Sequence, residues 1–441
     1  MKNIKIKNMI KISNKTFYDR HRREVEKYLN NKKSLHIINQ ISENKVVTTN
    51  SEKILLRLDD PKHLSTLKSD KKYERILLTD IIENHDDVFS LLTIVTSLLA
   101  DDGKLIVSSI NSKYSTIFKI FEYFGLKDSN KNNSYIHIKK IKNITNGIGL
   151  EYQKHYTKQY LPFKLFNLGD VMNRIMEVVF FQFNLGIKTY MIFRPTNRDR
   201  NELSKSIIIP AKNEEGNLSE LVSRIPQFTK AEIIFAYGES LDGTLKVIQD
   251  IAESNKDFNF KIVIQTKTGK ANAVWEALEV VENDVIAILD ADISVEPETL
   301  KDFFEIIENN SADFVNGTRL VYEMDKKSMR FLNKLGNRFF QFFISKIISE
   351  PLTDSLCGTK VFKKTYLDDL HHWQNTINIR DPFGDFDLIF SAAYSGQKIV
   401  ELPISYKERR YGTSQISRFK DGYKLLIYLL VSFGIFNTSK Q

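Results

Sequence analysis

The sequence predicts an α/β protein built from two successive sheet domains. In both halves of the 441-residue chain, short runs of Ile, Leu and Val alternate with longer segments of helical periodicity. Such alternation is typical of parallel strands joined by helical crossovers. The best defined strand covers residues 285–289 and runs directly into Asp290 and Asp292. A continuous apolar run of this kind suits a strand that is buried on both faces of a parallel sheet.

The positive charge is concentrated at the amino terminus. The net charge of the chain is +9, but residues 1–33 hold eleven Lys or Arg and three acids, a net of +8. The nearly neutral remainder argues against a nucleic-acid-binding body, which would need basic stripes over its folded surface. The basic tail at residues 1–15 either lies near anionic lipid or is simply solvated. The single cysteine, Cys357, excludes an intramolecular disulfide and fits a reducing cytoplasmic compartment.

Residues 16–145 are predicted to form the first sheet domain. A helix is expected at 17–29, strands at 35–39, 53–58, 75–79 and 104–110, and a further helix at 88–100. Residues 146–203 are expected to connect this domain to the next. Their apolar stretch at 171–193 is too interrupted by polar residues to span a membrane.

Two segments of this half, 73–80 and 102–111, resemble the later strands of class I S-adenosylmethionine-dependent methyltransferases. The likeness covers roughly residues 16–195. That family closes its first strand with a glycine-rich turn, whereas this chain has no glycine before Gly103. Without glycine, a tight turn and a close approach of the backbone to a cofactor are sterically disfavoured. We therefore expect a methyltransferase-like scaffold that has lost its cofactor.

The second half carries five short motifs in a fixed order, each beside a predicted strand or helix start. They are Ile209-Pro210-Ala211-Lys212-Asn213-Glu214, Glu232-Ile233-Ile234-Phe235, Ser240-Leu241-Asp242-Gly243-Thr244, Gly269-Lys270 and Leu289-Asp290-Ala291-Asp292. Ligand crevices of α/β folds lie at the carboxyl ends of the strands. Two carboxylates so placed can hold Mg²⁺ or Mn²⁺ on a diphosphate, although two solvated loop residues would be the better interpretation of an isolated Asp-x-Asp.

Together these motifs resemble glycosyltransferase family 2, whose domain has the GT-A fold, and within it the dolichyl- and polyprenyl-phosphate sugar transferases. The likeness spans about residues 204–422. It implies that Asp290 and Asp292 hold the metal and that Lys270 contacts the donor phosphate. The remaining donor contacts that it implies are Pro210, Ala211 and Glu214 at the nucleoside and Arg319 at the phosphate or sugar. The family's acid after the second strand, which reads the base, is absent here, and Glu239 is expected to replace it.

The acceptor side is expected at residues 354–360, 381–387 and 409–415. Asp385 and Asp387 lie where many inverting relatives place a general base at a helix start, although either could merely cap that helix. Residues 409–415 resemble the Arg-x-x-Gly-x-Ser-Lys loop of the polyprenyl-phosphate enzymes. This likeness makes Arg409 and Arg418 candidate phosphate ligands, with a catalytic role for Arg409, and makes Ser414 a further candidate binding residue. Gln415 replaces the lysine of that loop.

Two apolar segments indicate contact with a membrane surface. Residues 329–349 repeat apolar side chains at three- and four-residue steps, with basic residues on another face, as in interfacial helices. Packing inside the domain is the alternative. The carboxyl-terminal segment, 423–441, holds an apolar run at 425–436 that is too short to span a bilayer and either anchors at the interface or packs on the core.

The sequence thus predicts an inverting, Mg²⁺- or Mn²⁺-dependent hexosyltransferase, peripheral at the cytoplasmic face of the membrane. The expected donor is a nucleotide sugar of the GDP-mannose or UDP-glucose type, and the expected acceptor is a polyprenyl phosphate. Two alternatives remain open. The same fold could glycosylate a hydroxyl of a glycan or glycolipid, or the domain could be a catalytically silent scaffold that binds a nucleotide sugar.

Overall fold

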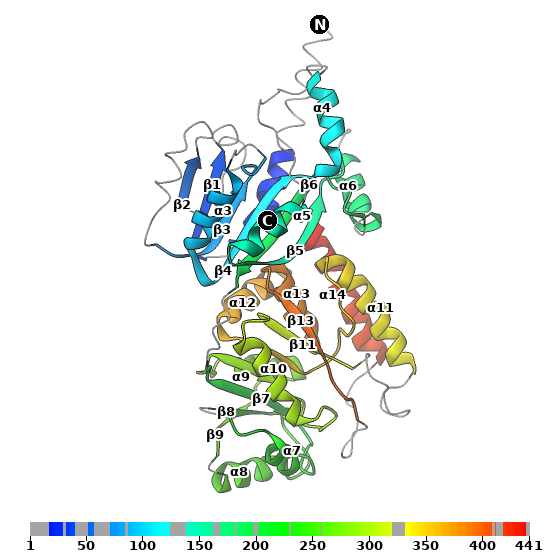
Figure 1. Ribbon diagram of the computed structural model, residues 1–441. Helices are drawn as coiled ribbons and strands as arrows, with labels where there is room; N and C mark the ends of the chain where they lie inside the picture. Colours follow the sequence, from blue (N-terminus) through cyan, green and yellow to red (C-terminus); the bar gives the residue numbers. More distant parts are fainter. Residues whose placement is uncertain are drawn as a thin grey trace. The chain divides into compact units, whose positions relative to one another are not determined.

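The protein is described by a computed structural model that divides the chain into two compact α/β units. Unit 1 comprises residues 1–197 and 436–441, and unit 2 comprises residues 198–435. The structure describes residues 17–29, 32–39, 52–56, 71–83, 87–123, 138–161, 168–180, 183–196, 202–228, 231–255, 257–319, 331–407, 411 and 418–437. Each unit is built around one sheet (Figure 1).

Unit 1 has a six-stranded mixed sheet. Its strands are β1 (Ser34–Asn39), β2 (Glu52–Leu56), β3 (Tyr73–Thr79), β4 (Leu99–Ile110), β5 (Leu150–Lys158) and β6 (Lys188–Pro195), in the order β2-β1-β3-β4-β6-β5. The first four are parallel to their neighbours, whereas β6 is antiparallel to both β4 and β5. The four strands expected from the sequence are therefore present. The parallel part is what the apolar runs predicted.

Helices of unit 1 lie at residues 17–26, α3 (Val88–Ser97), α4 (Ser115–Tyr123), α5 (Ile138–Gly147) and α6 (Leu168–Val179), with a 3₁₀ turn η2 (Ser112–Tyr114) before α4. The segment 146–203 differs from its expectation as a connector, because β5 and β6 within it are strands of the first sheet. Strand β5 could not be recognised from an apolar run, because Glu151, Gln153 and Lys154 interrupt its apolar residues.

The carboxyl ends of β3 and β4 are occupied by buried polar side chains of the same unit. Asp80 forms an ion pair with Lys188, and the His21 ring lies 2.8 Å from the Tyr190 hydroxyl. Glu83 accepts the Ile110 N–H at 2.6 Å, and burial, helped by the Asp80 charge, raises the pKa of Glu83 to about 7. The turn after β1, to which the missing-glycine argument applies, lies outside the described residues.

Unit 2 has a seven-stranded mixed sheet. Its strands are β7 (Lys205–Ala211), β8 (Ala231–Tyr237), β9 (Asn259–Ile264), β10 (Val285–Ile288), β11 (Phe314–Thr318), β12 (Lys360–Lys363) and β13 (Ile399–Pro403), in the order β13-β11-β12-β10-β7-β8-β9. Strands β10, β7, β8 and β9 are parallel. Strand β12 runs antiparallel to both β10 and β11, so its first residue lies beside the last residue of β10.

Helices cover both faces of this sheet and make it a three-layer unit. They are α7 (Leu218–Arg224), α8 (Thr244–Ser254), α9 (Lys270–Leu278), α10 (Leu300–Glu308), α11 (Phe331–Ile348), α12 (Leu367–Ile377), α13 (Asp385–Tyr394) and α14 (Arg418–Asn437), with 3₁₀ turns η5 (Pro297–Thr299) and η6 (Lys364–Tyr366). Alternate strand residues serve the two faces, as the pleat requires. Ile207 and Ile209 pack with α7, α8 and α10, whereas Ile208 packs with α9, α12 and α13.

Helices α11 and α14 both pack on α13 through aromatic rings. The centroid of the Phe386 ring lies 5.3 Å from that of Phe340 in α11 and 6.0 Å from that of Tyr428 in α14. Helix α11 occupies most of the predicted 329–349 segment. Among the described residues, no helix combines the length and the hydropathy that crossing a membrane would require.

Candidate active site

Four charged side chains meet at the carboxyl edge of the second sheet. Asp290 follows β10, Lys270 is the first residue of α9, Lys360 is the first residue of β12, and Asp385 is the first residue of α13. The antiparallel pairing of Ile288 with Lys360 brings the start of β12 to this edge. Local backbone geometry agrees with this placement: Gly269 has a φ of 107°, a value that favours glycine, and thereby sets the start of α9.

These four side chains form two ion pairs. Lys270 is paired with Asp290, and Lys360 donates to Asp385 at 2.6 Å and also to the Cys357 carbonyl. Burial alone would lower the pKa of the Lys270 ammonium, but the carboxylates of Asp290, Asp385 and Asp292 raise that pKa above its usual value. The ammonium of Lys270 is therefore a fixed positive charge among three carboxylates, in the place where the donor phosphates were expected.

Asp292 is largely buried, and its carboxylate acts on the Lys270 ammonium. Its carboxylate accepts the Ser294 N–H at 3.0 Å. Between them, Ile293 has a φ of 53°, which is uncommon for a β-branched residue and costs on the order of 1–3 kcal/mol. Burial raises the pKa of Tyr406, the Arg319 charge opposes this, and the carboxylates of Asp292 and Asp290 add to it. Both acids thus act on the same region, and a strained turn holds the second one there.

Gly358 lies against the pair formed by Asp290 and Lys270. A β carbon at this position would overlap the Asp290 carboxylate and lie 2.8 Å from the Lys270 ammonium. A larger residue here would displace the paired Asp290 and Lys270 side chains, so glycine leaves room for this ion pair. Neither Gly358 nor Lys360 received a role from the sequence, although both belong to the 354–360 segment that was expected on the acceptor side.

A divalent cation fits the chemistry of this edge. Among the described residues, no group of three or more His, Cys, Asp or Glu side chains is arranged to hold a metal ion. Mg²⁺, however, is usually bound through one or two carboxylates together with substrate phosphates, so a complete protein cage is not needed. Asp290 and Asp292 would be those two carboxylates, and Lys270 would lie beside the phosphates that complete the coordination.

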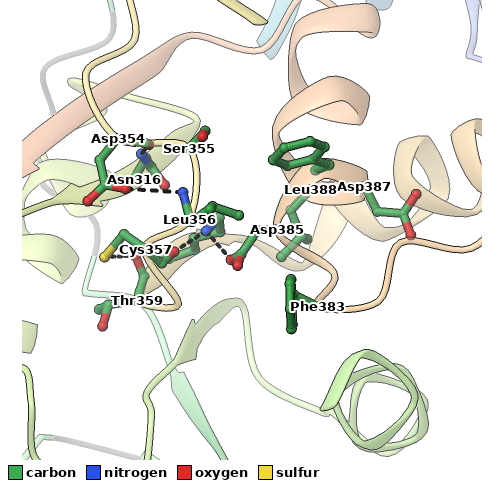
Figure 2. Close-up of polar contacts among 12 residues, drawn as sticks. Asn316, Asp354, Ser355, Leu356, Cys357, Thr359, Phe383, Asp385, Asp387 and Leu388 are labelled. Atoms are coloured by element: carbon green, nitrogen blue, oxygen red, sulfur yellow. Dashed lines mark hydrogen bonds and ion pairs between the residues drawn. The ribbon is translucent and has the colours of Figure 1, made fainter. Parts of the chain in front are cut away.

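Asp385 and Asp387 do not share one role. Asp385 points toward the loop of Leu356 and Cys357, whereas Asp387 points to the other side of α13 (Figure 2). Residues two apart on a helix cannot face the same way. Asp387 is buried, accepts the Tyr428 hydroxyl, and has its pKa raised to about 8 by burial and by the Asp381 charge. Asp387 is therefore largely protonated at neutral pH, and only Asp385 faces the other charged groups.

The cap of α13 is another acid, Asp381. Its carboxylate accepts the N–H groups of Phe386 at 2.6 Å and Asp387 at 3.2 Å. Burial and the Asp385 charge raise the pKa of Asp381 to about 6. The alternative in which Asp385 or Asp387 caps the helix is thus replaced by capping from outside the helix. This leaves the Asp385 carboxylate to Lys360.

Arg319 is placed differently from its expected donor contact. Its guanidinium binds Asp354 through Nε at 2.7 Å and Nη2 at 2.9 Å, and its backbone N–H donates to the same carboxylate at 3.0 Å. Burial would raise the pKa of Asp354, but Arg319 lowers it to about 2. Asn337 of α11 donates to Asp354 at 2.7 Å. In this structure Arg319 holds the loop that precedes β12 instead of lying open to a ligand.

The expected nucleoside residues lie around the end of β7. Pro210 is half-buried, Ala211 is buried, and Glu239, after β8, is exposed. Glu214 accepts the Asn217 amide at 2.6 Å, and its own N–H donates to Thr244 at 2.9 Å. These contacts fix the loop after β7 against the start of α8. Glu214 is thus a buried structural residue of this loop, and Glu239 is available at its rim.

The expected lipid-phosphate ligands Arg409 and Ser414 lie outside the described residues, as does Gln415. Tyr411, between them, is described. A β carbon on Gly216 would lie 2.7 Å from the Tyr411 ring, so the ring covers that glycine in the loop after β7. This contact, which could not be expected from the sequence, brings Tyr411 to the expected nucleoside side of the site.

A mixed α/β sheet with acids, a lysine and a close glycine at its carboxyl edge is the arrangement of a nucleotide-binding enzyme domain. The comparison with protein families identifies it further. Residues 206–370 match the family described as Glycosyl transferase family 2. This match indicates that this part of the chain is a glycosyltransferase domain.

Curated relatives match over about half of the chain. The low-salt glycan biosynthesis hexosyltransferase Agl6 of Haloferax volcanii is 28% identical over 52% of this chain and 53% of its own length. The dolichol-phosphate mannosyltransferase of Pyrococcus furiosus is 27% identical over 48% and 58%, respectively. The dolichyl-phosphate hexose transferase of Haloferax volcanii is 25% identical over 49% and 88%. The chain thus spans little more than half of the first two.

Among solved structures, a glucosyl-3-phosphoglycerate synthase from Mycobacterium tuberculosis, in complex with Mn²⁺, UDP and phosphoglyceric acid, is similar. It is 15% identical, with a TM-score of 0.40, over 53% of this chain and 79% of that one. S. aureus TarS 1–349 is 21% identical, with a TM-score of 0.35, over 52% of this chain and 65% of that one. Similarity at this level does not by itself establish a shared fold.

Proposed function

We propose that the protein is a divalent-metal-dependent, inverting glycosyltransferase of GT-A type. It would transfer a hexose from a nucleotide sugar of the GDP-mannose or UDP-glucose type to a polyprenyl phosphate at the cytoplasmic face of a membrane. The observation that carries the proposal is the meeting of Asp290, Asp292 and Lys270 with the Asp385–Lys360 pair at one sheet edge. The family match and the names of the relatives support the same reading.

The donor end is assigned to Asp290, Asp292 and Lys270. A bound Mg²⁺ or Mn²⁺ would offset the charge that develops on the leaving nucleoside diphosphate. Lys270 adds a positive charge at the amino terminus of α9, where free N–H groups already favour phosphate. Because Lys270 is held by Asp290, its ammonium is positioned before the donor binds, and little reorganisation is needed on binding.

The acceptor end is assigned to Asp385 and to the segment that holds Arg409 and Ser414. A phosphate monoester has its second pKa near 6, so a polyprenyl phosphate is mostly ionised at neutral pH and can attack the anomeric carbon without a base. Asp385 would then position groups around the acceptor through Lys360. Arg409 and Ser414 would bind the acceptor phosphate. The acceptors in the relatives' names, dolichol phosphate among them, support this choice.

A hydroxyl acceptor on a glycan or glycolipid is the second candidate. Gln415 stands where the polyprenyl-phosphate loop carries lysine, which favours it. A hydroxyl is a weak acid, and its attack needs a positioned carboxylate. Asp385 is the acid of the 381–387 segment that faces the site, since Asp387 lies on the far side of α13.

We further propose that unit 1 is a methyltransferase-type scaffold that binds no S-adenosylmethionine. The parallel part of its sheet supports the fold, and the Asp80–Lys188 and His21–Tyr190 contacts support inactivity, because they occupy the carboxyl ends of β3 and β4. Calorimetric titration of the whole protein with S-adenosylmethionine should show no binding at millimolar concentration. A micromolar dissociation constant would disprove the inactive scaffold.

For unit 2 we propose contact with the membrane through α11. Phe339, Phe342 and Phe343 are exposed at three- and four-residue spacing, whereas Phe340 and Ile344 are buried. Arg338 is exposed next to them, as in interfacial helices with basic flanks. Both alternatives from the sequence thus find support on different faces of α11, and the outward face is the one available to lipid.

The function is tested by a transfer assay with several nucleotide sugars, Mn²⁺ and a polyprenyl phosphate. Asp292→Asn should abolish Mn²⁺-dependent turnover with every donor. Because Asp292 is largely buried and accepts the Ser294 N–H, we expect the variant to lose about 1–2 kcal/mol of stability, so folding must be checked by thermal denaturation. Near-normal turnover by a folded variant would exclude the metal assignment, and an inactive wild type with all donors would favour the silent scaffold.

A further inference from the structure

Helix α6 of unit 1 is amphipathic in the reverse of the usual sense. The described polar side chains of α6 face the protein: Asn173 exchanges hydrogen bonds with the backbone of Leu161 at 2.8 and 3.0 Å, and Glu177 pairs with Lys158 at 3.1 Å. Both side chains are well covered, since Asn173 is 4% exposed and the Glu177 side chain 10%. The orientation of α6 is therefore fixed by specific polar contacts.

The opposite face of α6 carries apolar side chains that point outward. The residues concerned are Val171, Met172, Ile175, Val179, Phe180 and Phe183, which are 38–59% exposed and together form what we call the α6 surface. A surface helix normally buries its apolar stripe against the core. An apolar patch of this extent marks an interaction site more often than a neutral surface.

The neighbouring helix α4 extends the α6 surface. Lys113, just before α4, donates to the Phe183 carbonyl at 2.6 Å, and Tyr114 donates to the Leu185 carbonyl, so α4 starts at the end of the α6 surface. Ile117 and Ile120, one turn apart on α4, are 44% and 48% exposed. Among the described side chains of η2, α4 and α6, Lys113 and Lys119 are the exposed charged ones, and the acid Glu177 is paired with Lys158.

We propose that the α6 surface docks onto an anionic lipid bilayer. Apolar side chains beside lysines, with no exposed acid among the described side chains of η2, α4 and α6, match the charge of such a surface. The net charge of +8 in residues 1–33 belongs to the same unit and adds to the attraction. A second copy of this chain fits less well, since symmetric contact would bring the same lysines together. The inference is independent of the glycosyltransferase assignment, because it concerns unit 1.

The test needs a local reporter, because α11 of unit 2 is also proposed to bind lipid. Cys357 is the single cysteine and is buried, so a thiol-reactive environment-sensitive fluorophore will label an Ile175→Cys variant at the new site. With phosphatidylcholine vesicles that contain about 30% phosphatidylglycerol, we expect the emission to rise and shift to shorter wavelength. Phe89→Cys is the matched control, because Phe89 of α3 is 55% exposed in the same unit, and its label should not respond.

Affinity provides the second measurement. The triple variant Val171→Ser, Ile175→Ser and Val179→Ser should bind these vesicles roughly a hundredfold more weakly if each side chain contributes about fivefold, and Lys119→Gln should lose about fivefold on anionic vesicles only. The proposal would be refuted if the emission of the label at position 175 did not change with vesicles, or changed no more than that of the label at position 89. So would a label that responds to protein concentration without vesicles, since that result assigns the surface to contact between copies.

Discussion

The pair formed by Lys360 and Asp385 links stability to activity and allows a quantitative test. The Lys360 side chain is 0% exposed and that of Asp385 10%, with 2.6 Å between ammonium and carboxylate. Replacing only one partner of a buried ion pair leaves the other charge without compensation, at a cost of about 3–5 kcal/mol. We therefore predict that Asp385→Asn lowers the unfolding free energy by that amount, measured by urea denaturation.

The matched control removes both charges. In the double variant Asp385→Asn, Lys360→Met, no charge is left buried without a partner, so we expect most of the lost unfolding free energy to return. If Asp385→Asn alone changed stability by less than about 1 kcal/mol, the pair would be solvated and the desolvation argument would be wrong. If the double variant were as unstable as the single one, the loss would come from packing and not from charge.

Activity of the double variant then separates the two acceptors. With a polyprenyl phosphate, which is already ionised, we predict a loss of at most about tenfold through poorer positioning. With a hydroxyl acceptor, a missing base should cost about 10²–10⁴-fold. Asp387→Asn is the control, because this acid faces away from the site. A loss of a thousandfold or more with unchanged donor affinity would refute the lipid-phosphate acceptor.

Three further predictions follow from buried and exposed side chains. Arg319→Met should lower the unfolding free energy by about 3–5 kcal/mol, because the charge of the fully buried Asp354 loses its partner. The protein that remains folded should keep its KM for the donor within a few fold. A large rise in this KM without destabilisation would show that Arg319 contacts the donor. For Asp387, whose pKa rises in the folded state from 3.8 to about 8, the proton is bound more tightly in the folded protein. The unfolding free energy should therefore fall as pH rises from about 4 to 8. Asp387→Asn should make that fall less steep, while Asp381 and Glu83, whose pKa values are also raised, still contribute to it; an unchanged pH profile would contradict the raised pKa. Replacing Phe339, Phe342 and Phe343 by Ser should weaken liposome binding without lowering the melting temperature, whereas unfolding would identify them as core residues.

Strands β1 to β4 of unit 1 and β7 to β10 of unit 2 could be predicted from their apolar, largely β-branched runs, whereas β5 and β6 could not. The edge of the second sheet could also be predicted, since acids and glycines follow strands β7, β8 and β10 in order. The contacts that individual side chains make could not be predicted. Whether Arg319 meets a ligand or Asp354 depends on a loop that returns 35 residues later in the chain, and spacing carries no information about such contacts. The reversed direction of β12 likewise has no local signature, so Lys360 went unnoticed.

The opposite directions of Asp385 and Asp387 also escaped the sequence argument, for a simpler reason. Two acids two positions apart converge in an extended segment but diverge on a helix, and α13 begins at Asp385 itself. The acid that caps α13, Asp381, precedes the helix by four residues. Element boundaries therefore decided the roles of all three acids.

The antiparallel direction of β12 has a consequence for how the loop before this strand can vary in length. A strand that runs against its neighbours delivers its first residue to the ligand edge, so the Ile288–Lys360 register fixes Lys360 while the residues before it form a loop outside the sheet. Insertions or deletions in that loop would reshape the space above Asp290 without moving any strand.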